Sequence, residues 1–337
     1  MSAGFRIATF NVESLDDRPQ PGPDFTDRLA ILRPQLTRLR ADILCLQEVN
    51  SREDSRRGPR HLSALDQLLD GTSYEDFFRF ASVNRQGKRF SDRHNLVILS
   101  RWPIARSRQV WHDLVEAPRH KTVADGADFA VEWDRPLLHA ELDLGWPRPL
   151  HVINLHLRAP RAAFLPGLKD QGVWRSVGGW AEGFFLATIK RTGQALEARL
   201  LVDTIFDQDP GALIAVCGDF NAGDGETPVR TVRGDEEDTG NGHLAIRTLI
   251  PADRSVTSAQ RFSVIHHGRP LMLDHILLSR ALLGWYAACE IHNETLGDEL
   301  VSPALVRTAP DSYHAPVVAT FEPPSGPTRT LGIQASG

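Results

Sequence analysis

Residues 213–221 read LIAVCGDFN, and this stretch decides the fold class of the chain. Its apolar part has the length and the β-branched content of a buried strand, and it ends in Gly218, Asp219 and Asn221. A strand that ends in polar side chains displays them at the rim of a sheet, where groups from several strands can meet. The stretch therefore predicts a sheet protein with a polar site at one sheet edge.

Seven other short apolar runs have the same length and composition. They are residues 7–12, 43–47, 96–100, 137–144, 152–157, 273–278 and 317–321. The spacing of Leu29, Leu32, Leu36 and Leu39 predicts one helix, which Pro34 should kink or delay, and residues 196–206 predict another. Many strands with few helices predict an α/β fold in which helices cover stacked sheets.

Length and composition indicate one globular domain over residues 1–322 and a poorly ordered tail over 323–337, which is rich in Pro, Gly and Ser. No apolar run approaches the roughly 18 residues that cross a bilayer, and no signal-peptide pattern is visible, so we expect a cytoplasmic protein without a membrane span. The net charge of −5 and the pI near 6.2 exclude the strongly basic footprint of a high-affinity duplex binder. Any nucleic-acid contact is therefore expected to be local.

Polar side chains cluster at the ends of the predicted strands. They are Asn11, Glu48, His156, Asp219, Asn221, Asp274 and His314. Hard cations such as Mg²⁺ prefer oxygen ligands, and one or two carboxylates beside a substrate phosphate make a sufficient site, for which Glu48 is the best candidate. Asp219 and Asn221 share one face of an extended segment, because the strand period is two, and can hold a carboxylate and an amide against one phosphate.

The motifs FNV, LQEV, NLVILSRWPI, NLH, GDFN, LDHILLS and SYHAP occur between residues 10 and 316. The order is that of the endonuclease/exonuclease/phosphatase superfamily, which contains deoxyribonuclease I and the apurinic endonucleases, and the chain resembles this superfamily over almost its whole length. The resemblance implies an α/β (α+β) four-layer sandwich, with two packed mixed β-sheets flanked by helices. It also implies a site across the sheet edges.

The resemblance further implies a metal-dependent hydrolysis of phosphodiesters by in-line attack of water. Glu48 and Asn11 resemble the metal side of the site, with Glu48 as the direct ligand of Mg²⁺ (or Mn²⁺). Asp219 resembles the group that positions or deprotonates the attacking water. A cation and fixed donors suit this chemistry because they stabilise the charge on the phosphoryl oxygens.

Three further residues receive roles from the same resemblance. Asn221 and His156 resemble phosphate binders. Asp274 resembles the carboxylate that orients His314 and fixes its tautomer. Whether Asp219 or His314 is the formal base stays open at this point.

One position departs from the family pattern, because Tyr313 stands directly before His314 where the family usually has Asp. One carboxylate is therefore missing, which leaves the number of metals open. Asp311 lies two residues earlier, and in an extended segment its carboxylate would project to the same side as Tyr313 and partly substitute.

Three segments, 51–60, 84–94 and 158–192, are rich in arginine and lysine. The last follows the strand that ends in His156, so it should overhang the site, and it mixes cations with aromatic residues. Such a mixture can stack bases and hold phosphates, whereas the alternative is a satellite core of aromatics under a loop. The residues proposed to bind substrate are Asn95, Arg158, Trp174, Arg175 and Trp180.

These features favour a metal-dependent phosphodiester hydrolase that acts on nucleic acid, either DNA or RNA. A phosphoesterase for a small or lipid phosphoester is the first alternative, and the acidic pI favours it. The second alternative is a non-catalytic binding protein on the same scaffold, which Tyr313 motivates. In each case the partner is a phosphate-bearing molecule.

Overall fold

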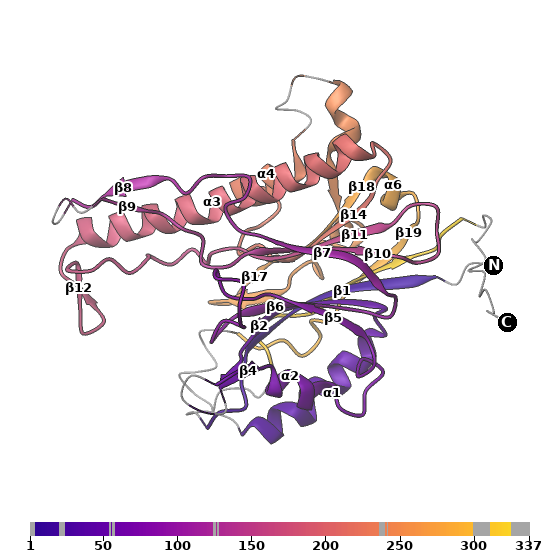
Figure 1. Cartoon of the computed structure of the whole chain (residues 1–337), viewed down its shortest axis with the longest axis horizontal. Coiled ribbons are helices and arrows are strands. Elements are labelled where there is room, and N and C mark those ends of the chain that lie inside the picture. Colours follow the sequence, from indigo (N-terminus) through magenta and orange to yellow (C-terminus); the bar gives the residue numbers. More distant parts are fainter. Residues whose placement is uncertain are drawn as a thin grey trace.

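The computed structural model describes residues 4–19, 24–53, 55, 58–123, 126, 128–235, 240, 242–298 and 311–324. Two six-stranded sheets pack face to face, and helices cover both outer faces (Figure 1). The predicted four-layer sandwich is confirmed, and each of the eight predicted strands is present. Most of the predicted tail, residues 325–337, lies outside the described residues.

The first sheet is mixed, because β1 and β2 are parallel whereas the other neighbours are antiparallel. Its order is β19 (Tyr286–Ile291), β20 (Val317–Phe321), β1 (Phe5–Leu15), β2 (Ile43–Val49), β6 (Asn95–Ser100) and β5 (Phe78–Ala81).

The second sheet is mixed for the same reason, with β11 and β14 as its parallel pair. Its order is β15 (Leu249–Pro251), β18 (Asp274–Ser279), β14 (Leu213–Asp219), β11 (Leu150–His156), β10 (Leu137–Leu142) and β7 (Ile104–Val110).

Different helices cover the two sheets. The first sheet is covered by α1 (Phe25–Leu39) and α2 (Ser63–Leu69), and the second by α3 (Val177–Gln208) and α4 (Thr227–Arg233) (Figure 1). The shorter elements are α6 (Arg280–Leu283) and the 3-10 turns η1 (Gly242–Arg247) and η2 (Ala252–Ser255). The two-stranded hairpins are β3 (Arg52–Glu53) with β4 (Arg60–His61), β8 (Arg119–Lys121) with β9 (Asp128–Ala130), β12 (Lys169–Asp170) with β13 (Val173–Trp174), and β16 (Val264–His266) with β17 (Arg269–Leu271).

Three apolar layers hold the four structural layers together, and the strand period of two assigns side chains to them. Ile7 of β1 faces the second sheet, whereas Ala8 and Phe10 of the same strand face α1 and α2. In β11, Val152 faces the first sheet and Ile153 faces α3 and α4. Central strands that are buried on both faces explain why the sequence shows continuous apolar runs instead of alternation.

Both helices start earlier than the sequence suggests. The first helix is not delayed by Pro34: it begins at Phe25, where the Asp24 side chain accepts a hydrogen bond from the Thr26 amide at 3.2 Å. The second helix, expected over residues 196–206, starts at Val177, inside the basic segment 158–192. Glycine has low helix propensity, and the glycines at the start of α3 hid the helical signal.

Candidate active site

The strand directions bring the predicted polar side chains to one edge of the sandwich. Asp219, the last residue of β14, pairs with His156 of β11 on one side and with Asp274 of β18 on the other. Asn11 of β1 donates from its amide nitrogen to the Asp219 carboxylate at 3.0 Å, which joins the edges of the two sheets. The convergence at this edge was correctly predicted from the strand ends.

Gly218 lets β14 approach β11 closely just before Asp219. Its φ is +144°, and a Cβ atom added there would lie 1.9 Å from the Leu155 carbonyl oxygen of the neighbouring strand. Only glycine can occupy this position without displacing the backbone.

Unusual backbone conformations cluster around the same edge. Five residues of the site region have left-handed φ angles, which cost free energy in non-glycine residues and are common where function fixes the geometry. They are Glu13 (47°), Ser14 (50°), Glu48 (63°), His94 (59°) and Asn221 (49°). Register shifts in β1 and β2 occur at the same places, so these irregularities aim side chains into the site.

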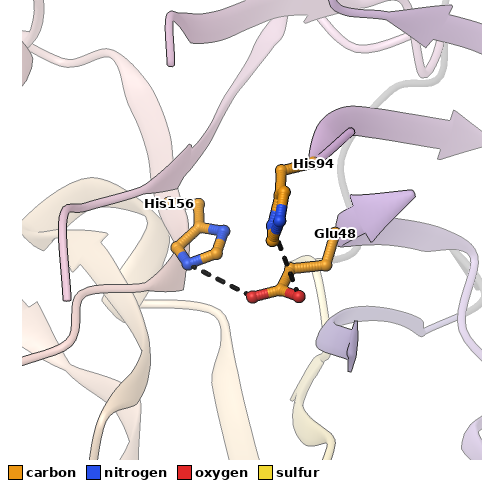
Figure 2. A group of neighbouring side chains, drawn as sticks. All are labelled: Glu48, His94 and His156. Atoms are coloured by element: carbon orange, nitrogen blue, oxygen red, sulfur yellow. Dashed lines mark ion pairs between the residues drawn. The ribbon is translucent and has the colours of Figure 1, made fainter. Parts of the chain in front are cut away.

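The Glu48 carboxylate lies between the imidazoles of His94 and His156 (Figure 2). One oxygen accepts from the Ser14 amide at 3.0 Å and from the Ser14 hydroxyl at 3.2 Å, and it lies 3.3 Å from His94 Nδ1. The other oxygen lies 3.8 Å from His156 Nε2. Burial raises the pKa of Glu48, but His94, His156 and Arg135 outweigh it, and the pKa lies well below its usual range. Glu48 is therefore ionised at neutral pH.

Asp219 is held by hydrogen bonds from both neighbouring segments. It accepts from the Asn221 amide at 2.8 Å and from the Asn221 side chain at 3.1 Å, and His156 Nε2 lies 3.3 Å away. Burial and the charge of Asp274 raise the pKa of Asp219 to about 7. Asp219 can therefore take up and release a proton near neutrality.

His314 lies beside the carboxylates of Asp219 and Asp274. Its Nδ1 lies 2.8 Å from Asp274 Oδ2, the pairing that the family resemblance implies. Burial alone would lower the pKa of His314, but Asp274 and Asp219 raise it to about 10. Hence His314 is a charged donor at neutral pH.

The donor set fits a divalent cation. Glu48, His94 and His156 offer three ligand atoms that lie within 4.8 Å of one another. Asp219, Asp274 and His314 lie equally close together, but a protonated His314 has no free lone pair for a metal. His156 Nδ1 and Asp274 Oδ1 are buried without a hydrogen-bond partner among the described residues. Burial and Arg135 hold the pKa of His156 well below its usual value, so its imidazole is neutral and available as a ligand.

Asn11 differs from its expected role as a metal ligand. Its amide oxygen accepts a hydrogen bond from the Glu13 backbone at 2.9 Å, and this contact turns the amide nitrogen toward Asp219 and Glu48. A nitrogen that donates to carboxylates cannot also ligate a cation. In this structure Asn11 positions the carboxylates instead.

The carboxylate found near Tyr313 is that of Glu13, not that of Asp311 as predicted. Asp311 belongs to none of the ligand groups found among the described residues. The charged side chain that acts on Asp311 is that of Arg28. Glu13 instead accepts a hydrogen bond from the Tyr313 amide at 2.8 Å, and the charges of His314 and Glu48 both act on its pKa. A carboxylate therefore stands close to the substituted position.

The sequence reasoning missed His94 and Arg135. His94 precedes β6 in a loop, and its left-handed backbone directs the ring to Glu48 (Figure 2). Arg135 places a guanidinium nitrogen 3.4 Å from His94 Nδ1, and Gln194 of α3 binds the Arg135 carbonyl. Neither residue ends a predicted strand, and the only available signal was their place next to predicted strands.

Asn95 is the first residue of β6, directly after the loop that carries His94. Asn95 is 1% exposed, and its amide nitrogen donates to the carbonyls of Val49 and Ser91 while its oxygen accepts from the Ser91 amide. These contacts satisfy the amide within the protein. The expectation that Asn95 binds substrate has no support in this geometry.

The other proposed substrate-binding residues divide into two places. Arg158 lies close to the site and pairs with Asp134 at 2.8 Å. Trp174, Arg175 and Trp180 belong to an arm made of β8–β9, β12–β13 and the N-terminal half of α3, which projects beyond the sheets (Figure 1). Only the start of the segment, residues 159–161, lines the pocket beside the site.

The exposed aromatics of the arm do not form the satellite core that was the alternative. Aliphatic residues hold the arm together, with Val131 and Leu186 among them. Phe164, Trp180 and Phe185 are exposed, and the rings of Trp180 and Phe184 stack at 5.5 Å. The arm thus presents an aromatic surface.

The basic loops are less positive than their composition suggests, because their arginines pair with carboxylates. Arg60 binds Asp92 at 2.7 Å, and Arg89 lies 3.6 Å from Glu53. Arg52 lies 3.6 Å from Asp17. Surface pairs of this kind contribute little stability but reduce the local field.

A pocket of about 440 Å³ opens next to the carboxylates. His314, Asn221 and Arg161 line it together with apolar residues of the β16–β17 region such as Met272. Its volume falls within the range of about 300–1,000 Å³ that is typical of small-ligand sites. The pocket can therefore receive a small ligand group beside Asn221 and His314.

Comparison with known proteins identifies the family. The profile of the Endonuclease/Exonuclease/phosphatase family matches residues 8–314. The chain belongs to this family. Its members are hydrolases that act on phosphoesters, which agrees with the carboxylates, imidazoles and ligand groups at the sheet edge. A sequence search of curated proteins finds no match.

Solved structures show the same fold at low sequence identity. Truncated Caenorhabditis elegans TDP2 aligns with a TM-score of 0.55 and 17% identity over 95% of this chain and 98% of that chain. The 3′ phosphatase NExo from Neisseria, bound to a product DNA hairpin, gives 0.54 and 17% over 94% and 99%. An AP endonuclease from Archaeoglobus fulgidus gives 0.52 and 17% over 94% and 99%. At this identity the likeness establishes the fold alone.

No helix among the described residues is both long enough and apolar enough to span a membrane.

Proposed function

We propose that this family member is a metal-dependent phosphodiester hydrolase that acts on nucleic acid by in-line attack of an activated water. One observation carries the proposal: the Asp219 carboxylate lies within 4.8 Å of the His314 imidazole at the sheet edge, and Asp274 holds that imidazole at 2.8 Å as a donor. A base and an acid of this kind are what the cleavage of a phosphoester requires.

Each side chain has a distinct part in the proposed reaction. Asp219 accepts the proton of the attacking water, and Asn11 and Asn221 hold its carboxylate in position. His314, kept charged by Asp274, donates to a phosphoryl oxygen. Asp219 is therefore the base in this proposal.

Glu48 would hold the cation, with His94 and His156 beside it. Mg²⁺ or Mn²⁺ is the proposed ion, because the Glu48 carboxylate together with the oxygens of a substrate phosphate suits a hard cation, and Mn²⁺ also accepts imidazole. When bound, the ion supplies neutralisation of the charge that develops on the phosphate. Glu13 supplies the carboxylate that Tyr313 cannot, since it binds the Tyr313 amide.

Two observations support nucleic acid as the substrate. Structural neighbours include a 3′ phosphatase bound to a DNA hairpin and an AP endonuclease. The arm adds exposed aromatics and cations, with Lys169 lying 5.2 Å from the ring centre of Trp174, and such surfaces stack bases sequence-tolerantly. A lipid or small phosphoester is the second candidate, because Val173 and Val177 on the arm are 70% and 80% exposed.

The test is a parallel assay with Mg²⁺ or Mn²⁺ on labelled DNA and RNA oligonucleotides, a dispersed phospholipid, and bis-p-nitrophenyl phosphate. We expect cleavage of an oligonucleotide, and loss of that cleavage in Glu48→Gln. Glu53→Gln is the matched control, because Glu53 pairs with Arg60 in a loop and lies in neither ligand group of the site. Hydrolysis of the small diester with intact oligonucleotides would overturn the nucleic-acid proposal, and no hydrolysis of any substrate would favour a binding protein.

A further inference from the structure

We propose that the chain carries a second cation site, built from His139, Glu141 and His151 and suited to a transition metal such as Zn²⁺. These residues lie on β10 and β11, on the face of the second sheet that points away from the first. His151 precedes His156 by five residues along one strand, so the two sites are separated by roughly 17 Å. The proposal does not depend on the proposed function of the active site.

Strand geometry brings the three side chains together. His151 and Glu141 are cross-strand partners, and His139 lies two residues before Glu141 on the same face. His139 Nε2 and His151 Nδ1 are 3.0 Å apart, and the ligand atoms of all three residues lie within 4.8 Å of one another. The two rings are nearly parallel, with an interplanar angle of 19°.

This spacing suits a shared ion. Two nitrogens 3.0 Å apart, each at a Zn–N bond length of about 2.05 Å, subtend about 94° at the metal. Opening their separation to about 3.3 Å gives the tetrahedral angle that zinc prefers. A movement of a few tenths of an ångström therefore changes a hydrogen-bonded pair into a pair of ligands.

The chemistry of the donor set selects the class of metal. Two imidazoles and one carboxylate suit Zn²⁺ and its neighbours, whereas Mg²⁺ prefers oxygen ligands alone. His139 and His151 are only 4% and 7% exposed, and this burial lowers the pKa of each imidazole, that of His139 to about 3. Both rings are therefore neutral at physiological pH, as metal ligands must be.

Arg108 of β7 competes with the ion. Its Nε lies 3.4 Å from His139 Nδ1 and donates to it, so the single ring proton of neutral His139 resides on Nε2 in the metal-free protein. Metal binding at Nε2 moves that proton to Nδ1, where it faces the Arg108 donor. Because Arg108 is exposed, it can swing into solvent, and its removal should tighten metal binding.

The test is a calorimetric titration of the metal-stripped full chain with Zn²⁺, supported by the visible spectrum of bound Co²⁺. We expect His151→Ala to lose one equivalent of bound metal that Glu48→Gln retains, and Arg108→Ala to bind that equivalent more tightly. The matched control is His292→Ala, since His292 lies 3.2 Å from Glu290 and belongs to none of the ligand groups among the described residues. It should bind like the wild type.

A second variant and a second readout guard against misfolding of His151→Ala. Zn²⁺ should raise the melting temperature of Glu48→Gln. Adding His139→Gln to that variant should abolish the rise while the unfolding transition stays cooperative. Unchanged stoichiometry in folded His151→Ala or His139→Gln would overturn the second site, whatever the outcome of the substrate assays. Equal affinity in wild type and Arg108→Ala would overturn the competition by Arg108.

Discussion

The Asp274→Asn substitution tests the charge state that the structure gives to His314. Asp274 is buried and lies 2.8 Å from His314 Nδ1. Asparagine has the same size and keeps an oxygen that can accept the hydrogen bond, but it removes the negative charge. The pKa of His314 should therefore fall, because burial still opposes the charged ring and only Asp219 remains to favour it strongly.

The size of the effect follows from the two pKa values. Raising the pKa of His314 from 6.5 to about 10 corresponds to about 5 kcal/mol of preference for the charged ring. Asp274 is the largest of the groups that raise it, and one opposite charge at this range accounts for about 1–3 pKa units. In Asp274→Asn the ring should titrate between about pH 7 and 9.

Stability should change with pH in the same direction. The folded pKa of His314 lies above its unfolded value of about 6.5, so the stabilisation is complete below pH 6.5 and is lost as the pH rises through about 10. Asp274→Asn should shift this loss to lower pH. Urea unfolding at several pH values measures it.

Histidine-resolved NMR titration gives the pKa directly, and the alkaline limb of kcat/KM against pH should follow it. Asp253→Asn is the matched control, because it removes the carboxylate 3.6 Å from another buried imidazole, His275, and should leave His314 unchanged. A His314 ring that titrates near pH 6.5 in the wild type, or still near 10 in Asp274→Asn, would refute the reasoning.

Three further changes have outcomes that the geometry dictates. Gly218→Ala should destabilise the fold by about 3 kcal/mol or more, because its Cβ would lie 1.9 Å from the Leu155 carbonyl oxygen, and a loss under about 1 kcal/mol in urea unfolding would contradict this. Glu13→Gln should raise the metal concentration for half-maximal activity by about tenfold, and an unchanged metal dependence would exclude a role near the cation. Trp180→Ala should raise KM for oligonucleotides by about tenfold or more and leave turnover of bis-p-nitrophenyl phosphate unaltered. An equal effect on both substrates would show that the arm does not bind the nucleotides beside the cleaved phosphate.

The strands and the site edge could be predicted from the sequence because the signals are local. A buried strand is a short apolar run, and its last polar residue, such as Glu48 or Asp219, marks the sheet edge where strands of the same direction end. The family motifs then added the roles of these residues. Strand pairing confirmed that His156, Asp219 and Asp274 are direct neighbours.

The remaining features depend on contacts between distant segments or on backbone conformations without a sequence signature. His94 reaches Glu48 only because its φ is 59°. Asn11 turns its nitrogen inward because the Glu13 amide holds its oxygen. The loop arginines find carboxylate partners that no spacing rule identifies.

The dependence of activity on a divalent cation held by Glu48 is the central claim, and one titration measures it. Metal-stripped wild type and Glu48→Gln are titrated with Mg²⁺ or Mn²⁺ while hydrolysis of bis-p-nitrophenyl phosphate is followed. Wild type should be inactive without metal and regain turnover on titration, and Glu48→Gln should stay at least about 10²-fold slower, since the ion contributes several kcal/mol. Turnover in the presence of excess EDTA, or a Glu48→Gln variant as active as the wild type, would contradict the claim.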